Sequence, residues 1–351
     1  MTGETKETSD LAQIKIFVGF IAAVIIVIIF RELKSIFLPF CMALLLYFFF
    51  NGVVKRLLKL RVPKVFVLTF LLVFIFIVFY FFGVLIYYGI SSFIDKFPAY
   101  SDKITEIVRN IFEQLKTPVA DLSKYIENFD WTKSIDTSAI TSIISSTFGS
   151  FATFIGNLVL VLVFLMFMLA GRTALSGRIT KAFDAEQADK IKYMINSIEN
   201  QVQQYLLIKT FVSLLTGIIG GIILFAGRFD FIIFSALLIF VLNFIPNFGS
   251  IIATFFPILI GLLKFGFTFR VLLVAVGLML TQFIIGNILE PRITGKSLNL
   301  SPIVILISLI FWGYVWGIVG MMLAVPLTSA IKIIFQNIPV LKPIAEIISA
   351  E

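Results

Sequence analysis

The sequence predicts an all-α, polytopic membrane protein of about eight transmembrane helices. Three observations carry this prediction: the chain of 351 residues is 60% hydrophobic, it contains 41 phenylalanines, and its mean hydropathy is +1.07. A helix needs about 20 apolar residues to cross a hydrocarbon core of ~30 Å. Several runs in this chain approach or exceed that length, which is typical of membrane proteins.

The expected spans follow one another along the chain. The first apolar run follows a charged N-terminal stretch and ends without a small-residue cleavage site, so we expect an uncleaved span and not a signal peptide. The last run is 33 residues long and is interrupted at 312–320, which predicts a helical hairpin. The expected spans are Ile14–Phe30, Ile36–Phe50, Val65–Ile90, Phe151–Ala170, Tyr205–Ala226, Phe231–Ile245, Ile251–Phe267, Val271–Leu289 and Ile303–Phe335.

The charges between the runs predict the orientation. Residues 51–64 carry five basic side chains and no acid, which favours the cytoplasmic side. Residues 91–147 then lie outside, with six basic and eight acidic residues, and residues 171–204 return inside. Both termini are therefore expected in the cytoplasm. Arg31 and Lys34, on the outer side, are a small exception.

The two long hydrophilic segments are predicted to be helical. Apolar residues repeat at three and four within 104–115 outside and within 191–205 inside, which indicates amphipathic helices. Asp184 and Gln187 are spaced as a capping pair for the inner helix. We therefore divide the chain into three N-terminal helices at 1–90, an extracytoplasmic segment at 91–150, and a transport core at 151–351 with a cytoplasmic insert at 171–204.

Composition excludes several function classes. The net charge is +8, but the basic residues lie mostly between apolar runs and form no patch, so we expect no nucleic-acid partner. The chain has no histidine and a single cysteine, Cys41. The usual general base and zinc ligands are thus missing, and no paired carboxylates lie within the spans. We expect no metal, no cofactor and no enzymatic activity.

Interrupted helices near the C-terminus point to a transport site. A helix break leaves backbone N–H and C=O groups without their hydrogen bonds. Within the membrane this is tolerated only where protein covers these groups or a cavity adjoins them. Paired interruptions of apolar segments indicate binding sites in transporters. The expected helix breaks are Pro246, Gly249, Pro291, Gly295, Pro302, Gly313, Gly317 and Gly320.

Polar residues near these breaks are the candidate solute path. Amide side chains offer both a donor and an acceptor without charge. Glu290 and Arg292 form an acid–base pair that is either an inner gate or the anchored end of a helix, and the segment 242–249 is either part of the site or an ordinary turn. The path residues are Asn243, Asn247, Gln282, Asn287, Glu290 and Arg292.

Two segments carry a family resemblance. IPNFGSIIATFFPILIGLL at 245–263 and GNILEPRITGKSLNLSPIVILISLIFWGYVWGIVGMMLAVPLTSAIKI at 286–333 resemble the autoinducer-2 exporter family of permeases. The resemblance implies a bacterial inner-membrane protein of about eight helices that forms an oligomer. It also implies export of autoinducer-2, or the sodium/proton exchange assigned to other members. Many of those relatives have an acid where this chain has Ile285, which counts against cation exchange at that position.

We therefore predict an inner-membrane exporter of a small polar solute, autoinducer-2 or a similar hydroxylated signal. The expected partners are that solute, the lipid bilayer and further copies of the chain. A sodium/proton antiporter and a structural membrane protein without transport activity are the alternatives.

Overall fold

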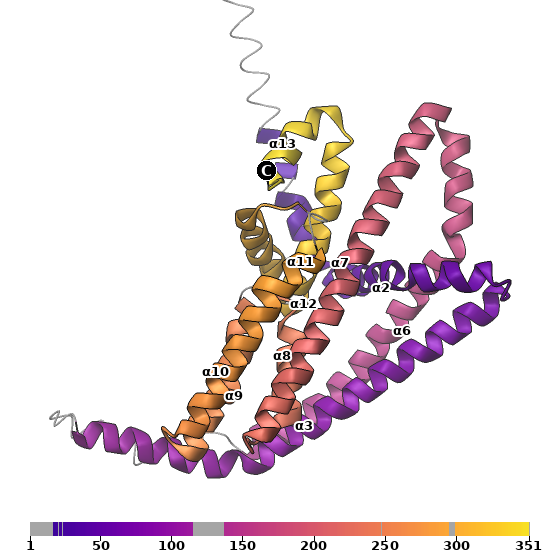
Figure 1. The fold of residues 1–351 in the computed structure, drawn as a ribbon. Helices are drawn as coiled ribbons and strands as arrows, with labels where there is room; N and C mark the ends of the chain where they lie inside the picture. The colour runs from indigo at the N-terminus through magenta and orange to yellow at the C-terminus, as the bar shows by residue number, and fades with distance from the viewer. Residues whose placement is uncertain are drawn as a thin grey trace, which may run out of the picture. The chain divides into compact units, whose positions relative to one another are not determined.

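The computed structural model describes residues 17–350 apart from residues 20, 23, 115–136, 247 and 295–298. The described chain is almost wholly helical and contains no β-sheet, which confirms the all-α class (Figure 1). Its long elements are α2 (Lys34–Lys59), α3 (Lys64–Gln114), α6 (Thr137–Ala182), α7 (Ala185–Ala226), α8 (Ile232–Leu242), α9 (Phe248–Phe265), α10 (Phe269–Phe283) and α12 (Pro302–Gln336). Short helices are a π-helix at Ile284–Leu289, α11 (Glu290–Thr294), a 3-10 turn at Pro339–Leu341 and α13 (Lys342–Ile348).

Within the described residues, six helices are long and apolar enough to cross a membrane. A seventh span exists if the pair Gly156–Gly171 and Ala174–Ala182, bent by 58°, counts as one. The predicted number of about eight is therefore not confirmed. The predicted span Phe231–Ile245 becomes α8, whose 11 residues reach only about 16 Å at 1.5 Å per residue.

Two predicted boundaries within the long helices are absent. The third span and the outer helix form one helix of 51 residues, α3, because the helical pattern continues past residue 90 without interruption. Likewise, the inner amphipathic helix and the fifth span are one helix of 42 residues, α7. The predicted cap at its start is confirmed, since the backbone N–H of Gln187 donates to the Asp184 carboxylate at 2.8 Å.

The described chain divides into two compact units, each built from separated segments. The first comprises Met1–Asn51, Leu158–Gln203 and Leu298–Glu351, and the second comprises Gly52–Asn157 and Gln204–Ser297. In the second unit, α8 packs on α3 and α9, and α9 packs on α10, as Figure 1 shows. Buried apolar side chains from α7 to α10 form its core: Leu224, Phe229, Ile239, Ala253, Val271, Val274 and Leu278.

Within the first unit, α12 is the predicted hairpin. The Ser308 hydroxyl contacts the Ala324 carbonyl at 3.1 Å and the Thr328 hydroxyl, although 20 residues of straight helix would span about 30 Å. The chain reverses at Gly317, whose backbone angles of φ 69° and ψ −147° are open essentially to glycine alone. The arms are 302–316 and 318–336, and the Trp316 indole donates to the Phe30 carbonyl at 3.0 Å.

Candidate functional site

A buried polar stripe on α7 is the centre of the candidate site. Tyr205, Lys209, Ser213 and Thr216 are spaced by four, four and three residues, which places them on one face of the helix. All four are buried, with exposed fractions of 7%, 5%, 0% and 1%. Buried polar side chains in a membrane helix are expensive and indicate a functional position.

The charged end of this stripe is an ion pair. Lys209 Nζ lies 2.7 Å from Glu290 Oε1, and their side chains are 6% and 23% exposed. The sequence suggested Glu290 and Arg292 as the acid–base pair; in the structure Glu290 pairs with Lys209, and Arg292 is exposed. The sequence could not show this pairing, because Lys209 and Glu290 are 81 residues apart and only the fold brings their helices together. One turn before Lys209, the Tyr205 hydroxyl is buried and has no hydrogen-bond partner among the described residues.

A π-helix positions Glu290. Residues Ile284–Leu289 form a wide turn, and the Glu290 amide donates to the Ile285 carbonyl five residues earlier. Pro291 follows directly, and its ring would clash with a carbonyl four residues back in a regular α-helix. The π turn accommodates that ring without ending the helix, so the chain continues through Pro291 to Thr294. Single π turns occur frequently at functional sites.

The uncharged end of the stripe meets the α8–α9 turn. Asn243, 6% exposed, ends α8 and donates its amide to the Ser213 hydroxyl at 3.0 Å. The segment that follows is a tight turn between two helices, in which a side chain at Gly249 would lie 1.7 Å from the Leu242 carbonyl. Only glycine fits there, so the break at Gly249 has a steric cause.

The structure thus joins two of the predicted path residues, Asn243 and Glu290, through neighbouring turns of α7. Gln282 is half-buried, and its amide nitrogen has no hydrogen-bond partner within the part of the chain that the structure describes; Asn287 is exposed. Asn247 and Gly295 lie outside the described residues. Of the remaining break residues, Pro246 is in the α8–α9 turn, Pro302 begins α12, and Gly313 and Gly320 lie on either side of Gly317.

The sequence analysis missed one buried acid. Glu199, in the predicted cytoplasmic insert, is 4% exposed and accepts hydrogen bonds from the Tyr47 hydroxyl at 2.9 Å and the Asn51 amide at 2.8 Å. All three belong to the first unit. The buried stripe on α7 could have been found in the sequence, since polar residues recur at helical spacing within the apolar run 205–226. Nothing in the sequence indicates that Glu199 contacts α2.

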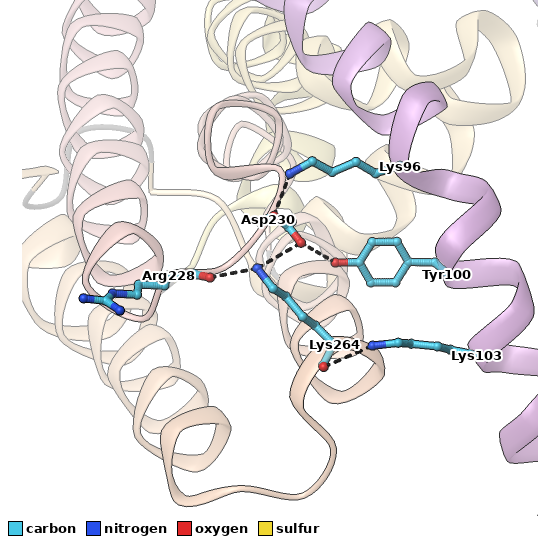
Figure 2. A network of polar contacts seen from close by, with 6 residues as sticks. All are labelled: Lys96, Tyr100, Lys103, Arg228, Asp230 and Lys264. Atoms are coloured by element: carbon cyan, nitrogen blue, oxygen red, sulfur yellow. Dashed lines mark hydrogen bonds and ion pairs between the residues drawn. The ribbon is translucent and has the colours of Figure 1, made fainter.

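A second polar cluster lies at the other end of α7. Asp230 accepts a hydrogen bond from Lys96 at 2.7 Å on Oδ1 and from Tyr100 at 2.7 Å on Oδ2, and Lys264 also lies 3.0 Å from Oδ2 (Figure 2). The Lys264 ammonium also donates to the Arg228 carbonyl at 3.1 Å. Residues 209 and 226 are separated by about 26 Å along α7 at 1.5 Å per residue, close to the thickness of a hydrocarbon core.

The loop that presents Asp230 is strained and firmly packed. Arg228 and Phe231 adopt left-handed φ values of 53° and 56°, a conformation that costs most residues of order 1–2 kcal/mol. Phe229, 4% exposed, anchors the loop against Gly261, where a side chain would lie 2.2 Å from the ring. The loop therefore holds the part of α3 that carries Lys96 and Tyr100, and the end of α9 that carries Lys264, in place relative to α7.

The ionisation of Asp230 makes this cluster sensitive to acid. Burial raises the pKa of Asp230, but hydrogen bonds from Lys96, Tyr100 and Lys264 outweigh it and lower the pKa to about 2. An unfolded aspartate titrates near 3.9. Because the folded pKa is depressed, the stabilisation is complete above about pH 4 and is lost as the pH falls towards 2.

We therefore predict that Asp230→Asn lowers the unfolding temperature at neutral pH, and that the difference from wild type shrinks between pH 4 and pH 2. Thermal unfolding of the purified protein across this range measures it. A difference that stays constant down to pH 2 would show that the Asp230 charge does not stabilise the fold.

Comparison with known proteins identifies the family. The AI-2E family transporter model matches residues 16–340. The chain belongs to the AI-2E transporter family. This confirms the resemblance drawn from 245–263 and 286–333. AI-2E family transporters are multi-pass membrane proteins, in agreement with the apolar helices described above.

Relatives of this AI-2E transporter are similar over nearly the full chain. A candidate transport protein of Haemophilus influenzae is 34% identical over 329 residues, which cover 91% of this chain and 92% of the relative. The AI-2 transport protein TqsA of Escherichia coli is 31% identical over 335 residues, covering 95% and 94%. A further E. coli protein, YhhT, is 42% identical over 132 residues, or 38% of each chain.

Proposed function

We propose that this AI-2E transporter exports a small, neutral, hydroxyl-rich solute across the bacterial inner membrane, with autoinducer-2 as the first candidate. The observation that carries the proposal is the buried stripe on α7, with Asn243 at one end and the Lys209–Glu290 pair at the other. The name of the relative TqsA supports the choice of solute.

The stripe has the chemistry that such a solute requires. A polar molecule that leaves water must exchange its hydration for hydrogen bonds to the protein, since unpaired polar groups are costly in hydrocarbon. Hydroxyls and amides both donate and accept, so Ser213 and Asn243 can bond to solute hydroxyls. The Tyr205 hydroxyl and the Gln282 amide nitrogen, which have no partner among the residues that the structure describes, add two donors. Glu290 can accept solute hydroxyls when Lys209 moves away from it.

Uptake into inverted membrane vesicles tests the proposal. Vesicles that contain the protein should accumulate autoinducer-2 faster than vesicles without it, because export from the cell becomes uptake in this orientation. A sodium gradient that changes internal pH without moving autoinducer-2 would favour the antiporter, for which the half-buried carboxylate of Glu290 is the supporting observation. No flux of either kind would favour a structural role.

We further propose that both termini are cytoplasmic and that Asp230 lies on the outer side. The five basic residues of 51–64 support this orientation. In a Cys41→Ser background, an impermeant thiol reagent added to intact cells should label Lys124→Cys and spare Lys59→Cys. Labelling of only the second would invert the topology.

Assembly into a homo-oligomer is also part of the proposal. Large apolar side chains remain exposed along α3, with Phe66 at 68% and Phe70 at 59%, so lipid or another copy must cover them. Light scattering corrected for bound detergent should give more than one chain per particle, and a monomer in several mild detergents would contradict this.

A further inference from the structure

The cluster around Asp230 carries more positive charge than its acid can neutralise. Lys264 is shared between Asp230, at 3.0 Å, and the Arg228 carbonyl, at 3.1 Å. The Arg228 guanidinium points away from Asp230 in Figure 2. Arg228 and Arg270 are both exposed, and neither forms an ion pair within the part of the chain that the structure describes.

Basic side chains gather at the turn between α9 and α10. Lys264 and Arg270 each lie 5.0 Å from the centre of the Phe265 ring, on which both pack. They are therefore no more than about 10 Å apart. Gly227 lies against Val274, one turn after Arg270 on α10, so the backbone of the neighbouring Arg228 lies close to the start of α10. Two basic side chains thus share one ring at this turn, and the backbone of a third basic residue, Arg228, lies beside them.

The same turn exposes large aromatic side chains. Phe267 is 98% exposed and Phe269 is 73% exposed, between the basic residues Lys264 and Arg270. Phenylalanine at this exposure is unfavourable in water and favourable in acyl chains. Lysine and arginine beside it extend to the phosphate level of a bilayer. The turn therefore has the pattern of a membrane–water interface, with apolar tips and charged flanks.

We propose that Arg228, Lys264 and Arg270 bind the phosphate headgroup of an anionic phospholipid, while Phe267 and Phe269 lie against its acyl chains. Guanidinium groups suit this ligand because they donate in pairs to phosphate oxygens. A soluble phosphate compound shares the headgroup chemistry, but it has nothing to contact the two phenylalanines. Through Lys264, the bound lipid is coupled to the Asp230 cluster that fixes the outer end of α3.

Native mass spectrometry of the full chain in detergent tests this site. The protein is mixed with equal amounts of phosphatidylglycerol and phosphatidylcholine of the same acyl chains. We expect preferential retention of phosphatidylglycerol, and Arg228→Gln/Arg270→Gln should weaken its binding by roughly 25-fold, or about fivefold for each basic side chain removed. Arg228→Lys/Arg270→Lys should restore much of it. Lys190→Gln/Lys192→Gln, which removes two basic side chains near the start of α7, is the control and should change nothing.

Two further measurements distinguish lipid binding from the binding of a soluble anion and from a loss of binding through misfolding. Phe267→Ser/Phe269→Ser leaves every charge in place and should also weaken phosphatidylglycerol binding. Inorganic phosphate should not compete. Equal retention of the two lipids by wild type would overturn the proposal, as would unchanged phosphatidylglycerol binding in the arginine or phenylalanine variants. Displacement by inorganic phosphate would assign the site to a soluble anion instead.

Discussion

Changing either member of the Lys209–Glu290 pair to glutamine is expected to reduce export of autoinducer-2 by more than about tenfold, which corresponds to at least ~1.4 kcal/mol on the barrier. Glu290→Gln should also be destabilised by about 3–5 kcal/mol, because it leaves the Lys209 charge buried without its partner. Lys209 is buried enough for this cost to apply, since its side chain is 6% exposed, whereas Lys209→Gln leaves Glu290, 23% exposed, and should be destabilised less. Vesicle uptake and thermal unfolding measure the two effects.

The double variant Lys209→Gln/Glu290→Gln separates stability from transport. Removing both charges leaves no unpaired ion, so the unfolding temperature should return close to that of wild type. Export should stay low, because the solute then loses the charged donor and acceptor at this end of the stripe. A double variant that folds and exports at the normal rate would exclude the pair from the path.

The chain offers a control of the same chemistry on the same helix. Lys190 and Glu186 form an ion pair at 2.6 Å near the start of α7, but their side chains are 70% and 81% exposed. Exposed pairs of this kind contribute little. The variants Lys190→Gln and Glu186→Gln should therefore leave both export and unfolding temperature unchanged.

The second large effect is expected at the α12 bend. Gly320→Ala should destabilise the protein by about 1–3 kcal/mol or more, because the added carbon would lie 2.0 Å from the Trp312 carbonyl oxygen. This oxygen belongs to the backbone, so it cannot turn aside as a flexible side chain would. The arms of the hairpin would have to separate, and the Ser308–Thr328 contact would be lost.

Gly83→Ala is the matched control. Gly83 lies within α3 with nothing within 4 Å of the added carbon. Replacing glycine by alanine in an unobstructed helix stabilises by up to ~1 kcal/mol. Unfolding temperatures should therefore move in opposite directions for the two variants. If Gly320→Ala is as stable as wild type, the bend does not require the close approach described here.

Local patterns predicted the elements whose causes are local. The third span, expected at Val65–Ile90, is the apolar part of α3 at Lys64–Gly89, because helix length and hydropathy alone decide it. The hairpin at 303–335 followed from glycines in an apolar run, and Gly317 supplies the reversal. The helix cap at Asp184 was predicted from its spacing of three residues from Gln187. In each case the residues that decide the structure are close in sequence.

Features that depend on distant contacts could not be predicted in this way. Glu290 was expected beside Arg292, its near neighbour, but its partner Lys209 is 81 residues away. The burial of Glu199 depends on Tyr47 and Asn51 of another helix. Only the fold brings these groups together, so a sequence can name polar candidates without pairing them. The Asn243–Ser213 contact is of the same kind.

The central claim is that a polar solute crosses the membrane along the α7 stripe, and thiol accessibility at Ser213 tests it most directly. Ser213 is fully buried, as is Ser235 of α8, which lies outside the proposed path and provides the control. Each is changed to cysteine in a Cys41→Ser background, in protein that still exports. A thiol reacts with a small hydrophilic methanethiosulfonate only where water and reagent reach it.

We predict that the Ser213→Cys thiol is modified during transport and that saturating autoinducer-2 slows this modification, while the Ser235→Cys thiol stays unreactive. If the Ser213→Cys thiol remains unreactive in protein that exports normally, or reacts at the same rate with and without the solute, then the solute does not pass along this face of α7.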